Sequence, residues 1–393
     1  MRGFEKFPVG KRKAQTLNFD GQIEECFSLD ESLSPAFCLK EQAAAENVSA
    51  LFPSLFYGGY AFAEGKLYAL TESGLLLQGE FSSPPVYAAG FYGGDEADLF
   101  GDGTSLFTVG GDGLIKLADV AGIPLCTHRF SLVLKDGRSL KVSAPFAPED
   151  FSVAHGAWEW RIGSSAGEIA GAAEIDGRLY VFCERGVYAC TQNGYDREAE
   201  VKFTPAGDIL ASSFASWGKT AYFLTGAGRL YSFGGAANCV AENVEFTPSA
   251  LKACAFSQGY ALTLSAEKTL VYDAEKKRVS YLKVNAAALG GAAAYADGKI
   301  LRFARSSGGG SLLSKPLDFG TCAPKKLSRV SFTGEGKIAL KISAEREEKS
   351  FSVAAGESVY PKMSGRKFVF LLNADDGAKI KKITVSYTVT GEV

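Results

Sequence analysis

Gly65-Lys66-Leu67-Tyr68-Ala69-Leu70 and Gly177-Arg178-Leu179-Tyr180-Val181-Phe182 are two copies of one phrase, a turn glycine followed at once by a short apolar-aromatic strand. Further copies begin at five other glycines: Gly103, Gly137, Gly218, Gly259 and Gly298. Neighbouring copies are 34 to 41 residues apart, which is close to the roughly 40-residue period of four-stranded propeller blades. The repeat therefore predicts an all-β chain that contains a β-propeller of the seven-bladed type.

A different pattern follows the serine- and glycine-rich stretch Ser306-Ser307-Gly308-Gly309-Gly310-Ser311. Apolar residues then alternate with polar ones, as in Ile338, Leu340 and Ile342. Strict alternation is typical of strands with one buried face, so we expect an antiparallel β-sandwich at 315–393. The propeller is expected at 51–310, and residues 1–50 are expected to form an N-terminal arm and a closing strand.

Composition narrows the class of protein. The 393 residues carry a formal net charge of -2, which gives no electrostatic case for nucleic-acid binding by the chain as a whole. The charge is uneven, because residues 315–393 hold 14 basic and 9 acidic residues. No run approaches the roughly 20 apolar residues that a membrane span needs, and the N-terminus lacks the apolar core of a secretion signal. We therefore expect synthesis in a cytoplasm and no membrane span.

The sequence offers little for metal or cofactor chemistry. Its eight cysteines show no C-x-x-C spacing and only two histidines are present, so we expect reduced thiols, no metal site and no cofactor. Gly101-Asp102-Gly103 and Gly111-Asp112-Gly113 look like fragments of calcium loops. Neither continues into the further ligands and late glutamate of such a loop, and we interpret both as hairpin turns.

The third repeat unit departs from the pattern through a proline-containing insertion. Prolines keep Ala144-Pro145-Phe146-Ala147-Pro148 out of regular ladder pairing, and loops of this kind often carry interactions. The predicted interaction loop consists of Pro145, Phe146, Pro148, Glu149, Phe151, Trp158 and Trp160. No nucleophile elbow, P-loop, zinc-protease motif or dinucleotide fingerprint occurs in the chain, so no catalytic residue is predicted.

Two stretches together resemble a known family. Ser143-Ala144-Pro145-Phe146-Ala147-Pro148-Glu149-Asp150-Phe151 is followed by Gly167-Glu168-Ile169 and by Leu179-Tyr180-Val181-Phe182-Cys183-Glu184-Arg185-Gly186. Leu317-Asp318-Phe319-Gly320 and the closing Ile380-Lys381-Lys382-Ile383-Thr384-Val385 lie in the C-terminal region. These residues resemble propeller proteins of tailed-phage virions, of which the tail nozzle or packaged-DNA stabilisation group (tail tubular protein B) is the nearest.

The resemblance implies a structural virion protein without catalysis, made in the bacterial host cytoplasm and located in the virion. It further implies a homo-oligomeric ring, contacts with other virion proteins and non-specific contact with DNA in a lumen. Two other functions stay open. One is a carbohydrate-binding adhesin or receptor-binding module, with either the C-terminal sandwich or the loop of Trp158 and Trp160 as the sugar platform. The other is a glycan-active propeller hydrolase with Glu149 or Glu159 as an acid or base.

Overall fold

The computed structural model describes residues 12–16, 23–27, 36–193, 196–306, 309–375 and 378–390. Residues 1–11, 17–22 and 28–35 of the predicted N-terminal arm lie outside the described residues. The chain divides into two compact units. The propeller unit is Leu39–Lys277 with Val284–Phe303, and the C-terminal unit is Met1–Cys38 with Arg278–Lys283 and Ala304–Val393. The predicted boundaries at 50, 310 and 315 remain predictions.

Short antiparallel strands build the propeller unit. The first sheet contains β4 (Val48–Phe52), β5 (Tyr60–Ala63), β6 (Lys66–Thr71) and β7 (Gly74–Glu80). A seven-stranded sheet follows, with β8 (Val86–Tyr92), β9 (Asp95–Gly101), β10 (Gly103–Gly110), β11 (Gly113–His128), β12 (Ser131–Asp136), β13 (Ser139–Val142) and β14 (Trp158–Arg161). Its long strand β11 pairs with β10 through its first part and with β12 through its last part, and so joins two four-stranded groups.

The remaining sheets of this unit repeat the four-stranded plan. They comprise β15 (Ile169–Ile175), β16 (Arg178–Cys183), β17 (Gly186–Asn193) and β18 (Asp196–Phe203); then β19 (Ala215–Trp217), β20 (Thr220–Leu224), β21 (Leu230–Phe233) and β22 (Ala237–Ala241). The next three strands are β23 (Lys252–Phe256), β24 (Gly259–Ser265) and β25 (Lys268–Asp273). The last sheet contains β27 (Ala288–Gly290), β28 (Ala293–Ala296) and β29 (Lys299–Arg305), with β3 (Phe37–Ala44) beside β29. In the described residues the helical elements are single 3-10 turns: η1 (Val153–His155), η2 (Ser164–Ala166), η3 (Ala211–Ser213) and η4 (Pro248–Ala250).

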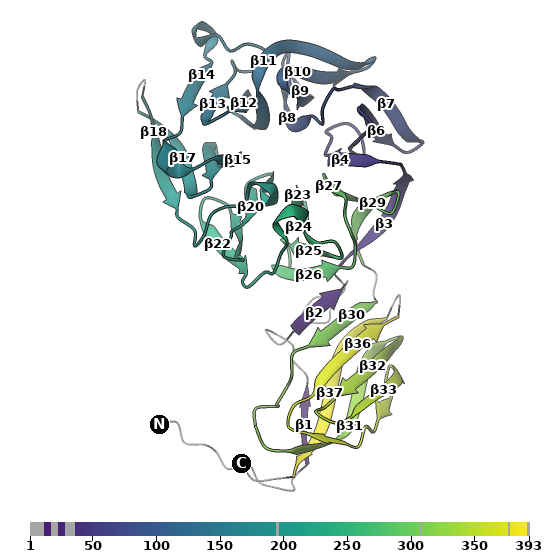
Figure 1. The fold of residues 1–393 in the computed structure, drawn as a ribbon. Coiled ribbons are helices and arrows are strands. Elements are labelled where there is room, and N and C mark those ends of the chain that lie inside the picture. Colours follow the sequence, from purple (N-terminus) through teal and green to yellow (C-terminus); the bar gives the residue numbers. More distant parts are fainter. Residues whose placement is uncertain are drawn as a thin grey trace. The chain divides into compact units, whose positions relative to one another are not determined.

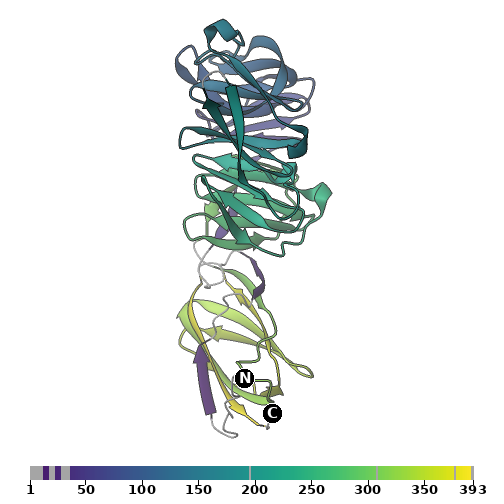
Figure 2. The same cartoon turned by 90° about the vertical axis from the view of Figure 1, so that its left-hand side faces the viewer.

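These sheets stand around a common centre like the blades of a propeller (Figure 1), and Figure 2 shows the same ring from the side. Between neighbouring sheets lie fully buried aromatic residues, for example Phe100 and Phe182. Both faces of a blade's inner strands are therefore covered, which explains why strands such as β5 and β24 are apolar almost throughout. The chain is an all-β protein with a β-propeller fold.

Six of the seven repeat glycines, all except Gly259, have positive φ. In the pairs Glu64-Gly65 and Asp176-Gly177 both residues have positive φ, between 50° and 80°. This is the type I′ turn, whose twist matches that of the flanking strands, and glycine adopts its backbone without steric cost. The sixth copy was predicted wrongly at one position: Gly259 is a strand residue, and the turn before it is Ser257-Gln258. A side chain at Gly259 would collide with the Tyr272 carbonyl, so close packing accounts for this glycine.

A buried carboxylate ties the first sheet to the next one. Asp98 of β9 is fully buried and accepts hydrogen bonds from the hydroxyls of Tyr60 on β5 and Tyr87 on β8, each at 2.8 Å. The Ser54 hydroxyl and the Leu55 amide also donate to the Asp98 carboxylate, at 2.7 Å and 3.0 Å. Burial, and then the nearby Asp98 charge, raises the pKa of both tyrosines far above its ordinary value, so both hydroxyls remain protonated donors.

The C-terminal unit contains two sheets. One comprises β1 (Arg12–Thr16), β37 (Lys379–Val389), β31 (Lys325–Glu335), β34 (Ser358–Val359) and β35 (Met363–Gly365). The strands of the other in this unit are β26 (Arg278–Leu282), β2 (Ile23–Phe27), β30 (Gly310–Ser314), β36 (Val369–Ala374), β32 (Lys337–Ser343) and β33 (Glu348–Ala354). One apolar core takes residues from both sheets, among them Phe332, Ile383, Leu340 and Phe370. The alternation in the sequence correctly predicted which side of these strands is buried.

Candidate functional site

The predicted interaction loop connects β13 to β14 in the propeller unit and is fixed by its own hydrogen bonds. The Ala144 amide donates to the Asp150 carbonyl at 2.7 Å, and the Asp150 amide donates to the Ala147 carbonyl at 3.1 Å. Pro145, Phe146 and Glu149 are exposed, Phe151 is half-buried and Pro148 is buried. The loop is therefore an ordered turn that presents part of its side chains to solvent.

The two tryptophans do not belong to this exposed surface. Trp158 and Trp160 lie on strand β14, where they pair with Val142 and Leu140 of β13. Trp160 is buried in an apolar core and Trp158 packs against the same core. The expectation that both residues are part of the loop is wrong, because the ladder resumes at Trp158 and turns the Trp160 ring inward.

Three phenylalanines form a cluster beside the loop: Phe91 near the end of β8, Phe130 in the turn between β11 and β12, and Phe146 in the loop itself. We call these three residues the aromatic cluster. The rings of Phe130 and Phe146 are stacked with centroids 4.5 Å apart, and Phe91 meets them edge-on at 5.2 Å and 5.8 Å. Phe130 is 49% exposed and Phe146 is 38% exposed. An ordered stack of this kind leaves a large apolar surface in contact with water, which is typical of a binding site.

Two members of the aromatic cluster have an unfavourable backbone. Phe130 and Phe146 have φ values of 68° and 61°, a left-handed conformation that costs about 1–2 kcal/mol for a residue with a side chain. Backbone bonds hold it in place: the Phe146 amide donates to the Phe130 carbonyl at 3.0 Å, and the Gly93 amide donates to the Phe146 carbonyl at 3.1 Å. Strain that keeps apolar rings exposed points to a functional role for the cluster.

Three exposed carboxylates lie on the segments that carry Phe91 and Phe146. Glu96 of β9 pairs across the hairpin with Phe91 of β8, and Asp95 pairs with Tyr92. Glu96 therefore lies beside Phe91 on one face of the sheet, while Asp95 lies beside Tyr92 on the other face. Glu149 belongs to the same loop as Phe146. We call Asp95, Glu96 and Glu149 the acidic rim. Among the described residues, none of these three carboxylates takes part in an ion pair.

Two histidine–carboxylate pairs lie near the cluster. Asp150 accepts from the Ser152 amide at 2.8 Å and contacts His155 Nδ1 at 2.5 Å, and these bonds lower the pKa of Asp150. His128 contacts Glu174 at 2.6 Å. Burial lowers the pKa of His128, and the Glu174 charge only partly opposes this effect. In both pairs the histidine and the carboxylate are engaged in hydrogen bonds that stabilise turns.

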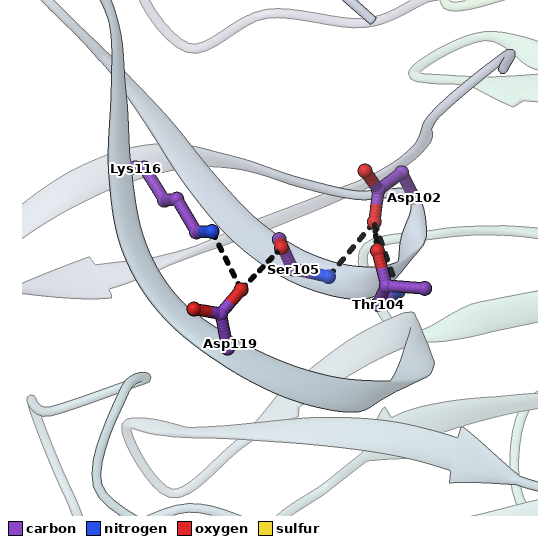
Figure 3. Close-up of polar contacts among 5 residues, drawn as sticks. All are labelled: Asp102, Thr104, Ser105, Lys116 and Asp119. Atoms are coloured by element: carbon purple, nitrogen blue, oxygen red, sulfur yellow. Dashed lines mark hydrogen bonds and ion pairs between the residues drawn. The ribbon is translucent and has the colours of Figure 1, made fainter. Parts of the chain in front are cut away.

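The calcium-like fragment Gly101-Asp102-Gly103 is a hairpin turn, as predicted, and its carboxylate closes that turn (Figure 3). Asp102 Oδ1 accepts from the Thr104 amide at 2.9 Å, the Thr104 hydroxyl at 2.8 Å and the Ser105 amide at 2.8 Å. Burial works to raise the pKa of Asp102, but these hydrogen bonds outweigh it and bring the pKa below its ordinary value.

The other carboxylate in Figure 3, Asp119 of β11, accepts from the Ser105 hydroxyl at 2.8 Å and pairs with Lys116 at 2.5 Å. The Lys116 and Ser105 hydrogen bonds lower its pKa. Within the described ranges no three histidine, cysteine, aspartate or glutamate side chains gather to hold a metal ion. In the same residues no helix is long and apolar enough to cross a membrane. Glu149 and Glu159, the carboxylates of the hydrolase alternative, are both exposed.

Sequence reasoning identified Phe146 but missed its two partners. Phe91, on strand β8, and Phe130, in a turn, are 55 and 16 residues before Phe146 in the chain. Neither position shows a periodic signal, because the contact depends on how neighbouring blades place their turns. The stretch Arg129-Phe130 between two strands was the available hint, since a large apolar residue is unusual at a turn.

No protein-family model matches the chain, and no curated protein matches it. Solved structures with similar folds include BamB from Moraxella catarrhalis, which is 13% identical over 74% of this chain and 96% of BamB, with a TM-score of 0.42. BBS1N, solved in complex with ARL6DN, is 12% identical over 69% of this chain and 95% of its own, with a TM-score of 0.44. YCF48 bound to D1 peptide is 9% identical over 72% of this chain and 100% of its own, with a TM-score of 0.43. At such low similarity no property of these proteins is transferred to this chain.

Proposed function

We propose that this chain is an assembly protein that works through protein–protein contacts and has no catalytic role. The observation that carries the proposal is the aromatic cluster, in which two strained phenylalanines remain exposed on a rigid scaffold. Fixed apolar rings bind a partner with little loss of conformational freedom on association. A catalytic site would instead need an activated nucleophile, acid or base, and the described residues around the cluster offer turn-forming carboxylates.

The resemblance of 142–188 and of 314–389 supports a more specific proposal: a structural virion protein of a tailed phage or prophage, in the tail or the head–tail nozzle. Its partners would be other virion proteins and further copies of itself in a ring. It would be made in the bacterial cytoplasm, and non-specific contact with DNA in the lumen remains part of this proposal. The carbohydrate-binding alternative is weaker, because the burial of Trp160 removes half of the expected sugar platform.

The finer architecture belongs to the same proposal: seven blades followed by a C-terminal β-sandwich. Its support is the strand order, in which six four-stranded groups occur in the propeller unit together with the three strands β23, β24 and β25. The shared core of the two C-terminal sheets supports the sandwich. Strand β3, which precedes the first sheet in the chain, completes the last group and would close the ring.

The neighbouring open reading frames and a particle analysis test the virion proposal. Portal, capsid or tail genes beside this one, and the protein in purified particles after induction, are the expected results. A gene that lies in a sugar-utilisation operon, with no protein in any particle, would overturn the virion role and leave only the assembly function.

A further inference from the structure

The two units of the chain carry opposite net charges. The propeller unit contains 20 lysines and arginines against 29 aspartates and glutamates, a net charge of -9. The C-terminal unit contains 22 against 15, a net charge of +7. The net charges of the two units nearly cancel, so the chain as a whole is almost neutral. The acidic unit of one copy can nevertheless attract the basic unit of another copy.

On the propeller unit, negative charge without a partner coincides with exposed apolar surface. Asp95, Glu96 and Glu149 form no ion pair among the described residues, whereas carboxylates elsewhere on the unit, such as Glu168 and Asp176, are paired with Arg138 and Lys219. The acidic rim therefore places carboxylates without an ion-pair partner on the segments that carry Phe91 and Phe146, while the exposed cation Arg129 precedes Phe130. A partner that fits both features presents cations on aliphatic stems, because such groups both stack on rings and bind carboxylates.

The C-terminal unit presents such groups on the outer face of strands β31 and β37. Lys326, Arg329 and Lys382 are exposed, while Leu327, Val330 and Ile383 beside them in sequence are buried. We call these three cations the basic face. Arg329 donates from Nε and Nη2 to the Ser358 hydroxyl at 3.0 Å and 2.8 Å, which fixes its side chain without neutralising it. In the described residues none of the three cations has a carboxylate partner.

The residues between these cations leave the face open to a partner. Arg329 pairs with Ser386 of β37, Ser331 with Thr384 and Thr333 with Lys382. Serine and threonine side chains are short, so the longer lysine and arginine side chains project beyond them. Among the described residues, the side chains between these cations are short enough to let an exposed ring stack reach them.

We propose that the aromatic cluster and acidic rim of one copy dock the basic face of a second copy. The inference rests on the proposed assembly function and specifies its contact: the interface is head-to-tail, between two different surfaces, and not a symmetric pairing of one surface with itself. Contacts of this type generate closed rings or open filaments according to the angle between successive copies. Arginine at the centre of the contact can bind a carboxylate with two hydrogen bonds while stacking on a ring.

A charge-swap experiment with the full chain tests the docking surfaces. The rim variant carries Asp95→Lys, Glu96→Lys and Glu149→Lys, and the face variant carries Lys326→Glu, Arg329→Glu and Lys382→Glu. A control with Glu72→Lys, Asp112→Lys and Glu267→Lys makes the same change of net charge at exposed sites outside the rim. Masses are measured by sedimentation over a range of protein concentrations, and circular dichroism melts verify that every variant is folded.

The wild type and the control are expected to self-associate, with weaker association at 1 M salt, where the Debye length falls to about 3 Å. Each charge variant alone should raise the dissociation constant by about 100-fold. An equimolar mixture of the two should assemble again, because the reversed rim then meets the reversed face. Phe130→Asn, which suits a left-handed backbone, should weaken association without reversing any charge.

Two results would overturn the inference, and they are distinguishable from each other. Oligomers that persist in both charge variants would reject these docking surfaces but leave self-assembly intact. A wild type that is monomeric at all concentrations would reject self-assembly itself, and binding of a lysine- and arginine-rich peptide through Phe130 would then identify a different cationic protein as the partner.

Discussion

Replacement of Asp98 by alanine tests whether the buried carboxylate holds the first two sheets of the propeller together. The substitution removes the carboxylate that accepts hydrogen bonds from the hydroxyls of Tyr60 and Tyr87. A buried donor without an acceptor costs about 1–3 kcal/mol. Water can replace the acceptor for Ser54 and Leu55, which are close to the surface, so the two tyrosines decide the magnitude.

We therefore expect Asp98→Ala to destabilise the propeller unit by about 4 kcal/mol, which corresponds to a decrease in Tm of roughly 10 °C. Tryptophan fluorescence is the appropriate assay, because all three tryptophans, Trp158, Trp160 and Trp217, belong to this unit. Tyr87→Phe removes a single donor and should cost about 1 kcal/mol. The exposed control Asp112→Ala should change stability by less than about 0.5 kcal/mol. A Tm for Asp98→Ala equal to that of the control would refute the reasoning.

Three further predictions concern separate parts of the chain. Burial lowers the pKa of His128, so below pH 6.5 the unfolded chain takes up a proton that the folded one does not. The free energy of unfolding should therefore decrease from pH 7 to pH 5. Urea titrations followed by fluorescence should show a smaller decrease for His128→Gln. Lys325 is fully buried, and its ammonium donates to the carbonyls of Thr321, Ala323 and Arg366, each at 2.7 Å. Lys325→Met should destabilise the C-terminal unit by about 3 kcal/mol, measured by circular dichroism. The unfolding transition followed by tryptophan fluorescence, which reports on the propeller unit, should not shift. Burial raises the pKa of Cys183 and Cys254 to about 12, whereas Cys239 and Cys322 are exposed. A thiol reagent at pH 8 should modify the two exposed cysteines within minutes and the two buried ones only after unfolding. Rapid labelling of Cys254 in the folded chain would contradict its burial.

The repeat was readable in the sequence because each blade uses the same local chemistry. Glu64-Gly65 and Asp176-Gly177 encode their turns through the residues themselves, and the alternation at Ile338, Leu340 and Ile342 encodes a buried face. Such features depend on neighbours in the chain, so no knowledge of the tertiary structure was needed to predict them.

The aromatic cluster and the Asp98 network could not be predicted in the same way. Their members are far apart in the sequence, and packing between neighbouring sheets and turns brings them together. Trp160 was predicted in a loop from its neighbours in the sequence. In the structure it pairs with Leu140 in a strand, and its ring is buried. Local pattern fixes strands and turns, while surfaces built across blades depend on tertiary packing.

The mass of the wild-type protein in solution, measured by light scattering across a hundred-fold range of concentration, tests the central claim most directly. The account predicts a mass that rises from the 41.7 kDa of one chain to a defined multiple of it, and ring-shaped particles in negative stain at the upper end. A constant mass of one chain throughout the range, at low salt, would contradict assembly as the function of this propeller.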